Sequence, residues 1–395
     1  MKNFYILICL SVIYSLLIGF ITTPSILAFS KREIAISKKN YKAFLLADAE
    51  SGRILYQDRI YENNYPASLV KMMVALITIE EINSGRISLN DNVIISSWAS
   101  KIGGHQVYLK QGEKFKLSEL MKATIIGSAN DAAVAIAEHV YGSVKVFIKK
   151  MNSRAKELGM LKTSFYSVHG LPPGKNQKID VSSAYDFYLL ALEVLKHPKF
   201  LQWSSTRLDS FRKGTFQLLN TNHRLIKSYH GMQGMKTGYH RKAGFNLVST
   251  AIRKGQRFIS IVLGAKNSRI RQKITRFLLD YGFENFKKYD LNYIGESISL
   301  SAKIEGGTVG SVPLKVAKSV RILLSDIERK KLRILPKIPI KTKAPIKANQ
   351  NLGNLEYWLN DKMLKKVHLQ TEFEVPKQNI LFVITEMFTN LNETN

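Results

Sequence analysis

A serine and a lysine stand three positions apart in the segment Tyr65–Lys71. The proline at position 66 suits the first turn of a helix, and the apolar spacing over residues 69–81 predicts that this helix continues. Because residues three apart on a helix lie one above the other, Ser68 Oγ and Lys71 Nζ can share a face. A neutral lysine amine could then take the serine proton and make the hydroxyl a nucleophile. Alternatively, the pair is an N-cap serine followed by a solvated lysine.

A second hydroxyl and an amide stand two residues apart in the segment 127–133, just before another apolar helical run. In a short loop, this spacing lets the side chains of Ser128 and Asn130 point into one cleft. Alternatively, the segment is an ordinary turn in which one of these two side chains caps the helix that follows.

A third segment, Gly234–Tyr239, carries a lysine and a threonine ahead of the alternating residues 245–249. This pattern predicts an edge strand, with a glycine at position 238 that allows a ligand to approach the backbone. Burial together with a second nearby cation would lower the pKa of Lys71 in the direction that a base requires. Alternatively, Lys236 is an exposed lysine on a hairpin strand.

The elements that must hold these residues follow from the apolar pattern. Residues 42–58 predict a β-hairpin, residues 244–249 and 258–263 predict two further strands, and residues 269–281 predict a helix. Strands at both ends of a helical block are typical of an α/β-type (α+β) domain with an antiparallel sheet packed on helices. The predicted helices of the block are 117–126, 132–141, 144–158 and 182–195, the last capped by Asp180 or Ser182.

The pattern changes after Phe286. Short alternating strands at 297–300, 312–316 and 320–323, separated by glycines, predict a small all-β domain. We expect an edge strand or an exposed loop at the basic residues 329–331 and at the proline-punctuated stretch 337–347.

Four segments result from these patterns. Met1–Ala28 has a basic start and an uncharged apolar core, which predicts a signal peptide or an uncleaved membrane anchor. Either one implies export, to the periplasm or cell envelope and at the outer face of the cytoplasmic membrane. The catalytic domain would span 29–287 and the β-rich domain 288–376. The tail, 377–395, has an apolar helical face, which favours either membrane association or an ordinary terminal helix or strand.

The composition is that of a folded, strongly basic protein. Its 395 residues are 45% hydrophobic and 23% charged, with a formal net charge of +29 at pH 7. No recognised nucleic-acid-binding motif accompanies this charge, so an anionic lipid surface or wall polymer is the expected partner and nucleic acid is not. The only cysteine, Cys9, lies in the first apolar stretch, which excludes a disulfide downstream. No cluster of metal-ligand residues predicts a metal.

In this order, the three motifs S-x-x-K, S-x-N and K-T-G resemble those of the penicillin-recognising serine acyl-transferases. Within that superfamily, the chain is most similar to the D-alanyl-D-alanine carboxypeptidases, the low-molecular-weight penicillin-binding proteins. The likeness extends from about Tyr41 to Phe286 and includes Gly103–His105 and His169–Leu171. It implies a transpeptidase/β-lactamase-like catalytic domain followed by a β-rich stalk.

The resemblance implies a serine-type carboxypeptidase that removes the terminal D-alanine from peptidoglycan stem pentapeptides without a cofactor. Ser68 would attack the penultimate carbonyl with Lys71 as its general base, and Ser128 would pass a proton to the departing D-alanine. A β-lactam would inhibit the enzyme by acylating the same serine, because its strained amide mimics the scissile bond. The implied substrate-binding residues are Asn130, Lys236, Thr237, Tyr239 and Arg271.

The resemblance implies a particular role for Tyr239 and another for Arg271. The backbone N–H groups of Ser68 and Tyr239 would bind the oxyanion. Many carboxypeptidases of this group carry histidine at the position of Tyr239, whereas here a histidine follows at position 240, a departure that concerns deacylation and substrate preference. Arg271 would bind the substrate carboxylate, or it is a surface charge on a helix. The other histidines near the motifs are interpreted as core or turn residues: His105, His169, His223 and His230.

Three other functions are compatible with parts of this pattern. A D,D-endopeptidase that cuts peptidoglycan cross-links would use the same residues. A serine β-lactamase often carries its deacylating glutamate in an E-x-x-x-N pattern between the second and third motifs, and no acid between Ser128 and Lys236 stands in that pattern. An envelope-binding protein on a degenerate scaffold would have lost one of the catalytic residues, yet Ser68, Lys71 and Lys236 are all present.

Overall fold

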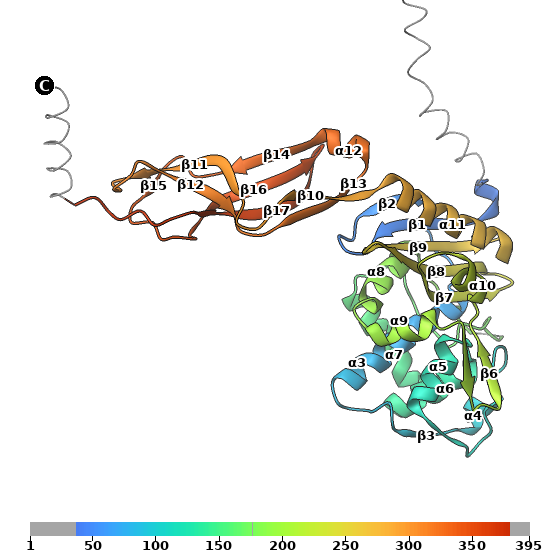
Figure 1. Cartoon of the computed structure of the whole chain (residues 1–395). Coiled ribbons are helices and arrows are strands. Elements are labelled where there is room, and N and C mark those ends of the chain that lie inside the picture. The colour runs from blue at the N-terminus through green and yellow to red at the C-terminus, as the bar shows by residue number, and fades with distance from the viewer. Residues whose placement is uncertain (1–36, 176, 380–395) are drawn as a thin grey trace, which may run out of the picture. The chain divides into compact units, whose positions relative to one another are not determined.

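The computed structural model describes residues 37–175 and 177–379 (Figure 1). Within them the chain forms two compact units, divided between Gly282 and Phe283, and each unit has a hydrophobic core of its own. The expected leader, Met1–Ala28, and nearly all of the expected tail, 377–395, lie outside the described residues. No helix among the described residues is both long and apolar enough to span a membrane.

The first unit is built on a five-stranded antiparallel sheet. The strands β1 (Ala43–Asp48), β8 (Gly244–Arg253) and β9 (Gln256–Ala265) are apolar and largely buried, whereas β7 (Met232–His240) lies at one edge. The predicted hairpin and the predicted edge strand are therefore confirmed. The order across the sheet is β2 (Ile54–Asp58), β1, β9, β8 and β7.

Helices cover both faces of this sheet (Figure 1). One face carries α11 (Ser268–Asn285), and the other carries a helical block around α3 (Lys71–Asn83). Ten of the 13 residues of α3 are buried, as expected for a helix that is apolar all round and packed on every side. The rest of the block is α5 (Leu117–Ile125), α6 (Asn130–Tyr141), α7 (Val144–Glu157), α8 (Ala184–Val194) and α9 (Pro198–Ser205).

Helices occupy all of the predicted helical segments, but α9 was not predicted and the start of α8 differs from the prediction. Its N-cap is Ser183, whose hydroxyl accepts a hydrogen bond from the N–H of Asp186 at 3.0 Å. The expected caps, Asp180 and Ser182, are therefore wrong. Asp180 points instead at the turn 166–167, where three donors satisfy its carboxylate.

Short elements complete the first unit. In the described part of the chain, two pairs of short strands, two 3-10 turns and two short helices connect the longer helices and strands. They are η1 (Lys38–Asn40), η2 (Ala67–Val70), β3 (Asn92–Ile94) with β4 (Lys114–Lys116), α4 (Ser97–Lys101), β5 (Leu208–Phe211) with β6 (Phe216–Leu219), and α10 (His223–Ser228).

The second unit is a small all-β body, as predicted. Its core is formed by inward-facing residues of the sheet, including Leu314 and Tyr357, which are fully buried. One pair consists of β10 (Lys287–Asn292) and β13 (Val320–Leu324). A six-stranded sheet has the order β14 (Leu332–Lys337), β16 (Asn351–Leu359), β17 (Lys362–Thr371), β12 (Ser311–Val316), β11 (Ser297–Glu305) and β15 (Thr342–Lys343).

One basic stretch of this unit is not the edge strand or loop that we expected. Residues 329–331 end a short helix, α12 (Asp326–Lys331). Ser325 and Glu328 form a capping box at its start, and the three cations occupy its last turn, where the helix dipole favours positive charge.

Candidate active site

Ser68 lies in the turn η2, directly before the buried helix α3. Its side chain is partly exposed, while its neighbours Ala67 and Leu69 are buried. Ala67 has a left-handed backbone, with φ of 51°, which costs a residue with a Cβ about 1–2 kcal/mol. The turn therefore holds a reachable hydroxyl at the N-terminal end of a helix, where backbone N–H groups lack helical partners.

Lys71 lies beneath this hydroxyl, and its side chain is completely buried. Its Nζ lies 3.0 Å from Ser68 Oγ, and it donates hydrogen bonds of 2.7 Å to Asn130 Oδ1 and to the carbonyl oxygen of His169. A neutral amine has two N–H bonds and one lone pair. Because the two oxygens take the N–H bonds, the lone pair of a neutral Lys71 is left for the serine.

The surroundings of Lys71 favour this neutral form. Burial lowers its pKa well below the ordinary lysine value, and the nearby Lys236 lowers it further. Two buried carboxylates, Asp180 and Asp131, act in the opposite direction and offset part of the shift. The predicted combination of burial and a second cation is therefore present in the structure.

Lys236 and Ser128 form the second part of the site. Lys236, on the edge strand β7, is 1% exposed and donates to Ser128 Oγ at 2.8 Å and to the carbonyl of Thr237 at 3.0 Å. Burial, followed by the charge of Arg271, lowers the pKa of Lys236 to about 7. The interpretation of Lys236 as an exposed hairpin lysine is therefore wrong.

The segment around Ser128 is strained and does not serve as a helix cap. Ser128 has φ of 61°, a left-handed conformation of the kind that occurs at functional sites. The N-cap of α6 is Ala129, so neither Ser128 nor Asn130 caps this helix. Asn130 instead spans two segments, because its Oδ1 accepts from Lys71 and its Nδ2 donates to the carbonyl of Gly103 at 2.7 Å.

The strand β7 passes very close to the serine turn. A Cβ at Gly238 would lie 2.5 Å from the carbonyl oxygen of Pro66 and 3.2 Å from the backbone nitrogen of Ser68. Only glycine allows this approach, whereas the sequence had suggested that the glycine makes room for a ligand. The neighbouring Thr237 donates its hydroxyl to Thr221 Oγ1 at 2.7 Å, which adds a second hydroxyl that the sequence motifs did not identify.

The last two predicted residues have different environments. Tyr239 is 57% exposed, and its ring stacks on Phe245 with 4.1 Å between centroids. Arg271 is 6% exposed and donates to the carbonyl of Asn246 at 3.2 Å, so its interpretation as a surface charge is wrong. Burial lowers the pKa of Arg271 to about 10, and its Nε is buried without a partner in the described structure.

The turn that ends in Gly170 also contributes to the site, which the motifs did not predict. His169 was interpreted as a core or turn histidine, but its backbone carbonyl accepts from Lys71. Burial, followed by the charge of Lys71, lowers the pKa of its ring to about 4, so the ring is neutral at pH 7. Asp180 fixes this turn by accepting from Ser167 Oγ at 2.6 Å, and the same Oγ accepts from the N–H of Gly170 at 2.8 Å.

One group elsewhere in the described residues has the geometry of a metal site. The ligand atoms of Glu80, Glu193 and His197 lie within 4.8 Å of one another. Arg154 donates to Glu80 at 2.7 Å and to Glu193 at 3.2 Å, so a guanidinium already supplies positive charge to both carboxylates. We therefore assign no metal to this group.

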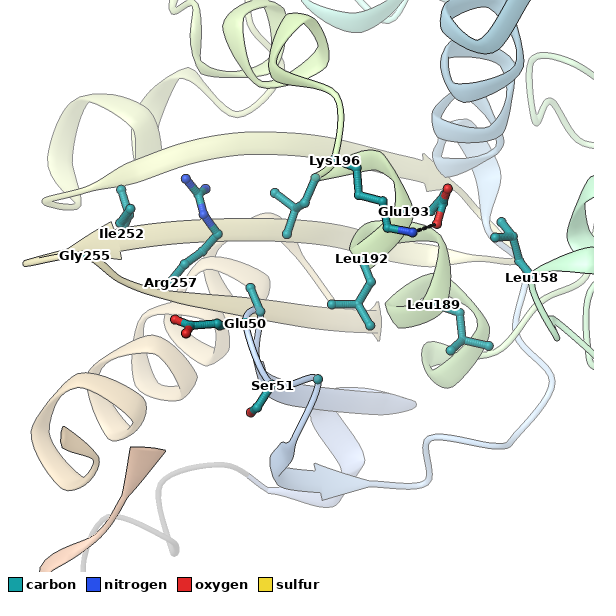
Figure 2. A pocket seen from close by; sticks show the side chains of 13 residues that line it. Glu50, Ser51, Leu158, Leu189, Leu192, Glu193, Lys196, Ile252, Gly255 and Arg257 are labelled. Atoms are coloured by element: carbon teal, nitrogen blue, oxygen red, sulfur yellow. Dashed lines mark hydrogen bonds and ion pairs between the residues drawn. The ribbon is translucent and has the colours of Figure 1, made fainter. Parts of the chain in front are cut away.

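A pocket of about 680 Å³ opens on another part of the first unit (Figure 2). Leucines of α8, the β1–β2 turn at 49–52 and Arg257 line it, and Lys196 pairs with Glu193 at its rim. None of the motif residues lines this pocket. The candidate active site, which the motif residues define, therefore lies outside this pocket.

Two family models match the chain. The model described as D-alanyl-D-alanine carboxypeptidase matches residues 31–267, and the model described as the C-terminal domain of penicillin-binding protein 5 matches residues 283–377. The D-alanyl-D-alanine carboxypeptidase DacF of Bacillus subtilis is 35% identical over 320 residues, which are 80% of this chain and 80% of that protein. DacC of Escherichia coli is 31% identical over 363 residues, 88% of this chain and 87% of that protein.

Solved structures of penicillin-binding proteins also match this chain. Penicillin binding protein 5 from Haemophilus influenzae matches with a TM-score of 0.70 at 28% identity, over 86% of this chain and 98% of that chain. Penicillin-Binding Protein D2 from Listeria monocytogenes, solved in an ampicillin-bound form, matches with a TM-score of 0.56 at 32% identity, over 62% and 97%. The predicted resemblance and fold class are thus confirmed. The chain belongs to the D-alanyl-D-alanine carboxypeptidase family, the serine hydrolases of the cell wall that bind penicillin.

Proposed function

We propose that Ser68 is the nucleophile of this carboxypeptidase and that Lys71 is its general base. The observation that carries the proposal is the arrangement around Lys71 Nζ, which lies 3.0 Å from Ser68 Oγ while two oxygens accept its N–H groups. Lys71 takes the hydroxyl proton as Oγ attacks the penultimate carbonyl carbon of a peptide ending in D-Ala-D-Ala. The product of this step is a tetrahedral oxyanion.

The second step releases D-alanine. The C–N bond breaks, and Ser128, held by Lys236 at 2.8 Å, relays a proton to the departing amine. This is the proton that Lys71 took from Ser68, so Lys71 is neutral again. The remaining peptide is then an ester of Ser68. Water hydrolyses this ester, which yields a peptide carboxylate and the free hydroxyl. The backbone N–H groups of Ser68 and Tyr239 stabilise the oxyanion in both steps.

The terminal carboxylate of the substrate binds at the edge of β7. Thr237 and Thr221 present two hydroxyls 2.7 Å apart, and the buried cations Lys236 and Arg271 supply positive charge beside them. Asn130 completes the substrate-binding set between Lys71 and Gly103. This supports the assignment of the substrate-binding residues and adds Thr221 to them.

Mass spectrometry after incubation with a labelled penicillin tests the nucleophile. We expect the mass of one adduct on the wild-type protein and no adduct on Ser68→Ala. Ser84→Ala is a matched control, because Ser84 caps the other end of α3 and its hydroxyl donates to the carbonyl of Glu81. An adduct that persists in Ser68→Ala refutes the assignment, and rapid loss of the adduct from the wild type indicates β-lactamase activity.

A second assay compares the cleavage of cross-linked and linear muropeptides. Faster cleavage of the cross-linked muropeptides indicates an endopeptidase.

We also propose the domain division 1–28, 29–287, 288–376 and 377–395, with the first segment acting as a signal peptide or anchor. The two family matches, 31–267 and 283–377, support the middle boundary. Members of this family are in general exported cell-wall enzymes, which agrees with an N-terminal export signal. N-terminal sequencing of the protein from cell envelopes tests the cleavage after Ala28, and an intact Met1 supports the anchor instead.

Finally, we propose that the protein attaches to the anionic outer surface of the cytoplasmic membrane. A groove of about 540 Å³ between α10 and α11 supports this, because Arg224, Arg269 and Lys273 line it and none of the three forms an ion pair with another described residue. Sedimentation with vesicles of anionic lipid should retain the wild type and lose the triple glutamine variant at low salt. If the vesicles retain the triple variant but not a protein that lacks residues 377–395, the tail alone attaches the protein to the membrane.

A further inference from the structure

Asn246 is a fully buried residue of β8 whose side chain bonds to two other segments. Its Nδ2 donates to the carbonyl of Tyr65 at 2.8 Å and to the carbonyl of Pro66 at 3.1 Å. Its Oδ1 accepts from the N–H of Gly264 on β9 at 2.7 Å. The amide thus ties the serine turn to two strands of the sheet.

The two bonds to the turn depend on its backbone conformation. Pro66 has helical angles, φ −71° and ψ −27°, so successive carbonyls point in the same direction and reach one NH₂ group. The left-handed Ala67 then redirects the chain into the turn that carries Ser68. Asn246 therefore holds the last two carbonyls before the strained position.

The same residue is in register with the strand on the other side of the site. Asn246 pairs with Gly238 of β7, and Gly238 is the residue whose backbone approaches the carbonyl of Pro66. Two constraints from the sheet therefore act on that single carbonyl, one from the Asn246 side chain and one from the Gly238 backbone. Together they fix the separation between the Ser68 turn and the strand that continues into Tyr239.

We propose that Asn246 is a positioning residue that sets the separation of the two oxyanion donors, the backbone N–H groups of Ser68 and Tyr239. This inference rests on the proposed function, because those donors belong to it. Donors stabilise the oxyanion only when they lie at hydrogen-bond distance from its position in the transition state. Loss of the Asn246 hydrogen bonds to the serine turn therefore slows the chemical step and leaves ground-state binding almost unchanged.

Kinetics of acylation by a fluorescent penicillin test the proposal through Asn246→Ala. We expect the maximal rate of acylation to fall about 100-fold, as for loss of an oxyanion donor or a displacement of about 1 Å, while the apparent dissociation constant changes less than about threefold. Asn152→Ala is the matched control, because Asn152 also donates to two backbone carbonyls and accepts from one N–H. We expect this control to lose stability and to keep an acylation rate within about twofold of the wild type.

A second readout separates positioning from a loss of folding. A depsipeptide ester and its thionoester differ only in the atom that occupies the oxyanion hole, and sulfur is larger and a weaker acceptor. The wild-type enzyme should strongly prefer the oxygen ester, and Asn246→Ala should lose most of that preference. Asn246→Ser, which keeps one donor, should give an intermediate preference, and it replaces the alanine variant if that variant does not fold.

Two outcomes overturn the inference: an unchanged preference for the oxygen ester in a folded Asn246 variant, or a weaker apparent dissociation constant with an unchanged maximal rate. Failure of the underlying mechanism has a different signature, because Ser68→Ala would then still be acylated. The two failures are therefore distinguishable within one set of variants.

Discussion

At the scale of single residues, the site is governed by two lysines buried in one cluster. Lys71 and Lys236 are each completely inaccessible or nearly so, and each lies close enough to another cation to lower its pKa. Burying two ammonium groups together is unfavourable, so the cluster favours loss of protons. This cost has a chemical use, since only a neutral amine can act as a base.

The coupling between the lysines predicts a change in the pH dependence of Lys236→Gln. After burial, the charge of Lys236 is the largest influence that lowers the pKa of Lys71. Removing this charge raises the pKa of Lys71, so the acidic limb of the acylation rate should move to higher pH. Rates measured with a fluorescent penicillin from about pH 5 to 10 check this.

Lys227→Gln is the control for this experiment, because Lys227 is an exposed lysine of α10. We expect its profile to coincide with that of the wild type. If the acidic limb of Lys236→Gln stays in place or moves to lower pH, the electrostatic coupling is not the one that the structure implies.

Lys236 also predicts how stability varies with pH. An unfolded lysine keeps its proton up to about pH 10.4, whereas folded Lys236 loses its proton near pH 7. Between these values the unfolded state binds more protons, so the contribution of Lys236 to the free energy of unfolding increases with pH. Lys236→Met should therefore show a smaller increase than the wild type between pH 7 and 9 in urea titrations. Equal slopes contradict the low pKa.

The predictability of these residues differed according to their chemistry. Side chains with reactive groups at fixed spacings, such as Ser68 with Lys71, could be found from the sequence, and the structure brings them together. The carbonyl of His169 could not, because every residue has a carbonyl and this one meets Lys71 across 98 positions. Asn246 gave no signal either, since a buried amide in a strand has no characteristic pattern.

At the scale of elements, the site depends on the contact between two turns, one that contains Gly170 and one that contains Ser68. Gly170 has φ of 76°, and a Cβ there would lie 2.1 Å from the carbonyl oxygen of Ala67. The turn that carries the His169 carbonyl and the turn that carries Ser68 therefore touch through their backbones. A displacement of either turn changes the distance between Lys71 Nζ and Ser68 Oγ.

Gly170→Ala should separate these two turns. The methyl group must displace the carbonyl of Ala67, so we expect acylation by penicillin to fall about 100-fold. Gly142→Ala is the matched control, because Gly142 has φ of 73° and open space around its Cβ position. Both variants should lose about 1–2 kcal/mol of stability from the left-handed backbone. Equal acylation rates in the two variants would show that the contact between the turns has no catalytic role.

The elements themselves were largely predictable from apolar periodicity. Long helices such as α7 and α11 and the β1–β2 hairpin have strong patterns, and their predicted bounds fell close to the observed ones. The errors concern ends, short pieces and unpredicted elements, since no individual element was predicted at α9, β16 or β17. The capping residue of α8 was misplaced because several adjacent side chains can cap. The helix α12 was missed although Ser325 and Glu328 stand in the S-x-x-E spacing of a capping box.

At the scale of the whole molecule, two separate cores divide the described chain. The core of the second unit includes Leu314, which is fully buried on β12. Leu314→Ala should lower the stability of that unit by about 2–5 kcal/mol. Calorimetry should show two transitions, of which only one shifts, and the acylation rate should remain that of the wild type. A single transition that shifts as a whole contradicts independent cores.

Tyr239, whose exposed ring stacks on Phe245 at the edge of β7, is a suitable position for a fluorescent label. From residue 29 onward the sequence contains no cysteine. In a protein that begins at residue 29, Tyr239→Cys therefore gives one thiol, and maleimide chemistry can attach a single dye without background labelling. Such a dye would report arrival and departure of antibiotics in real time.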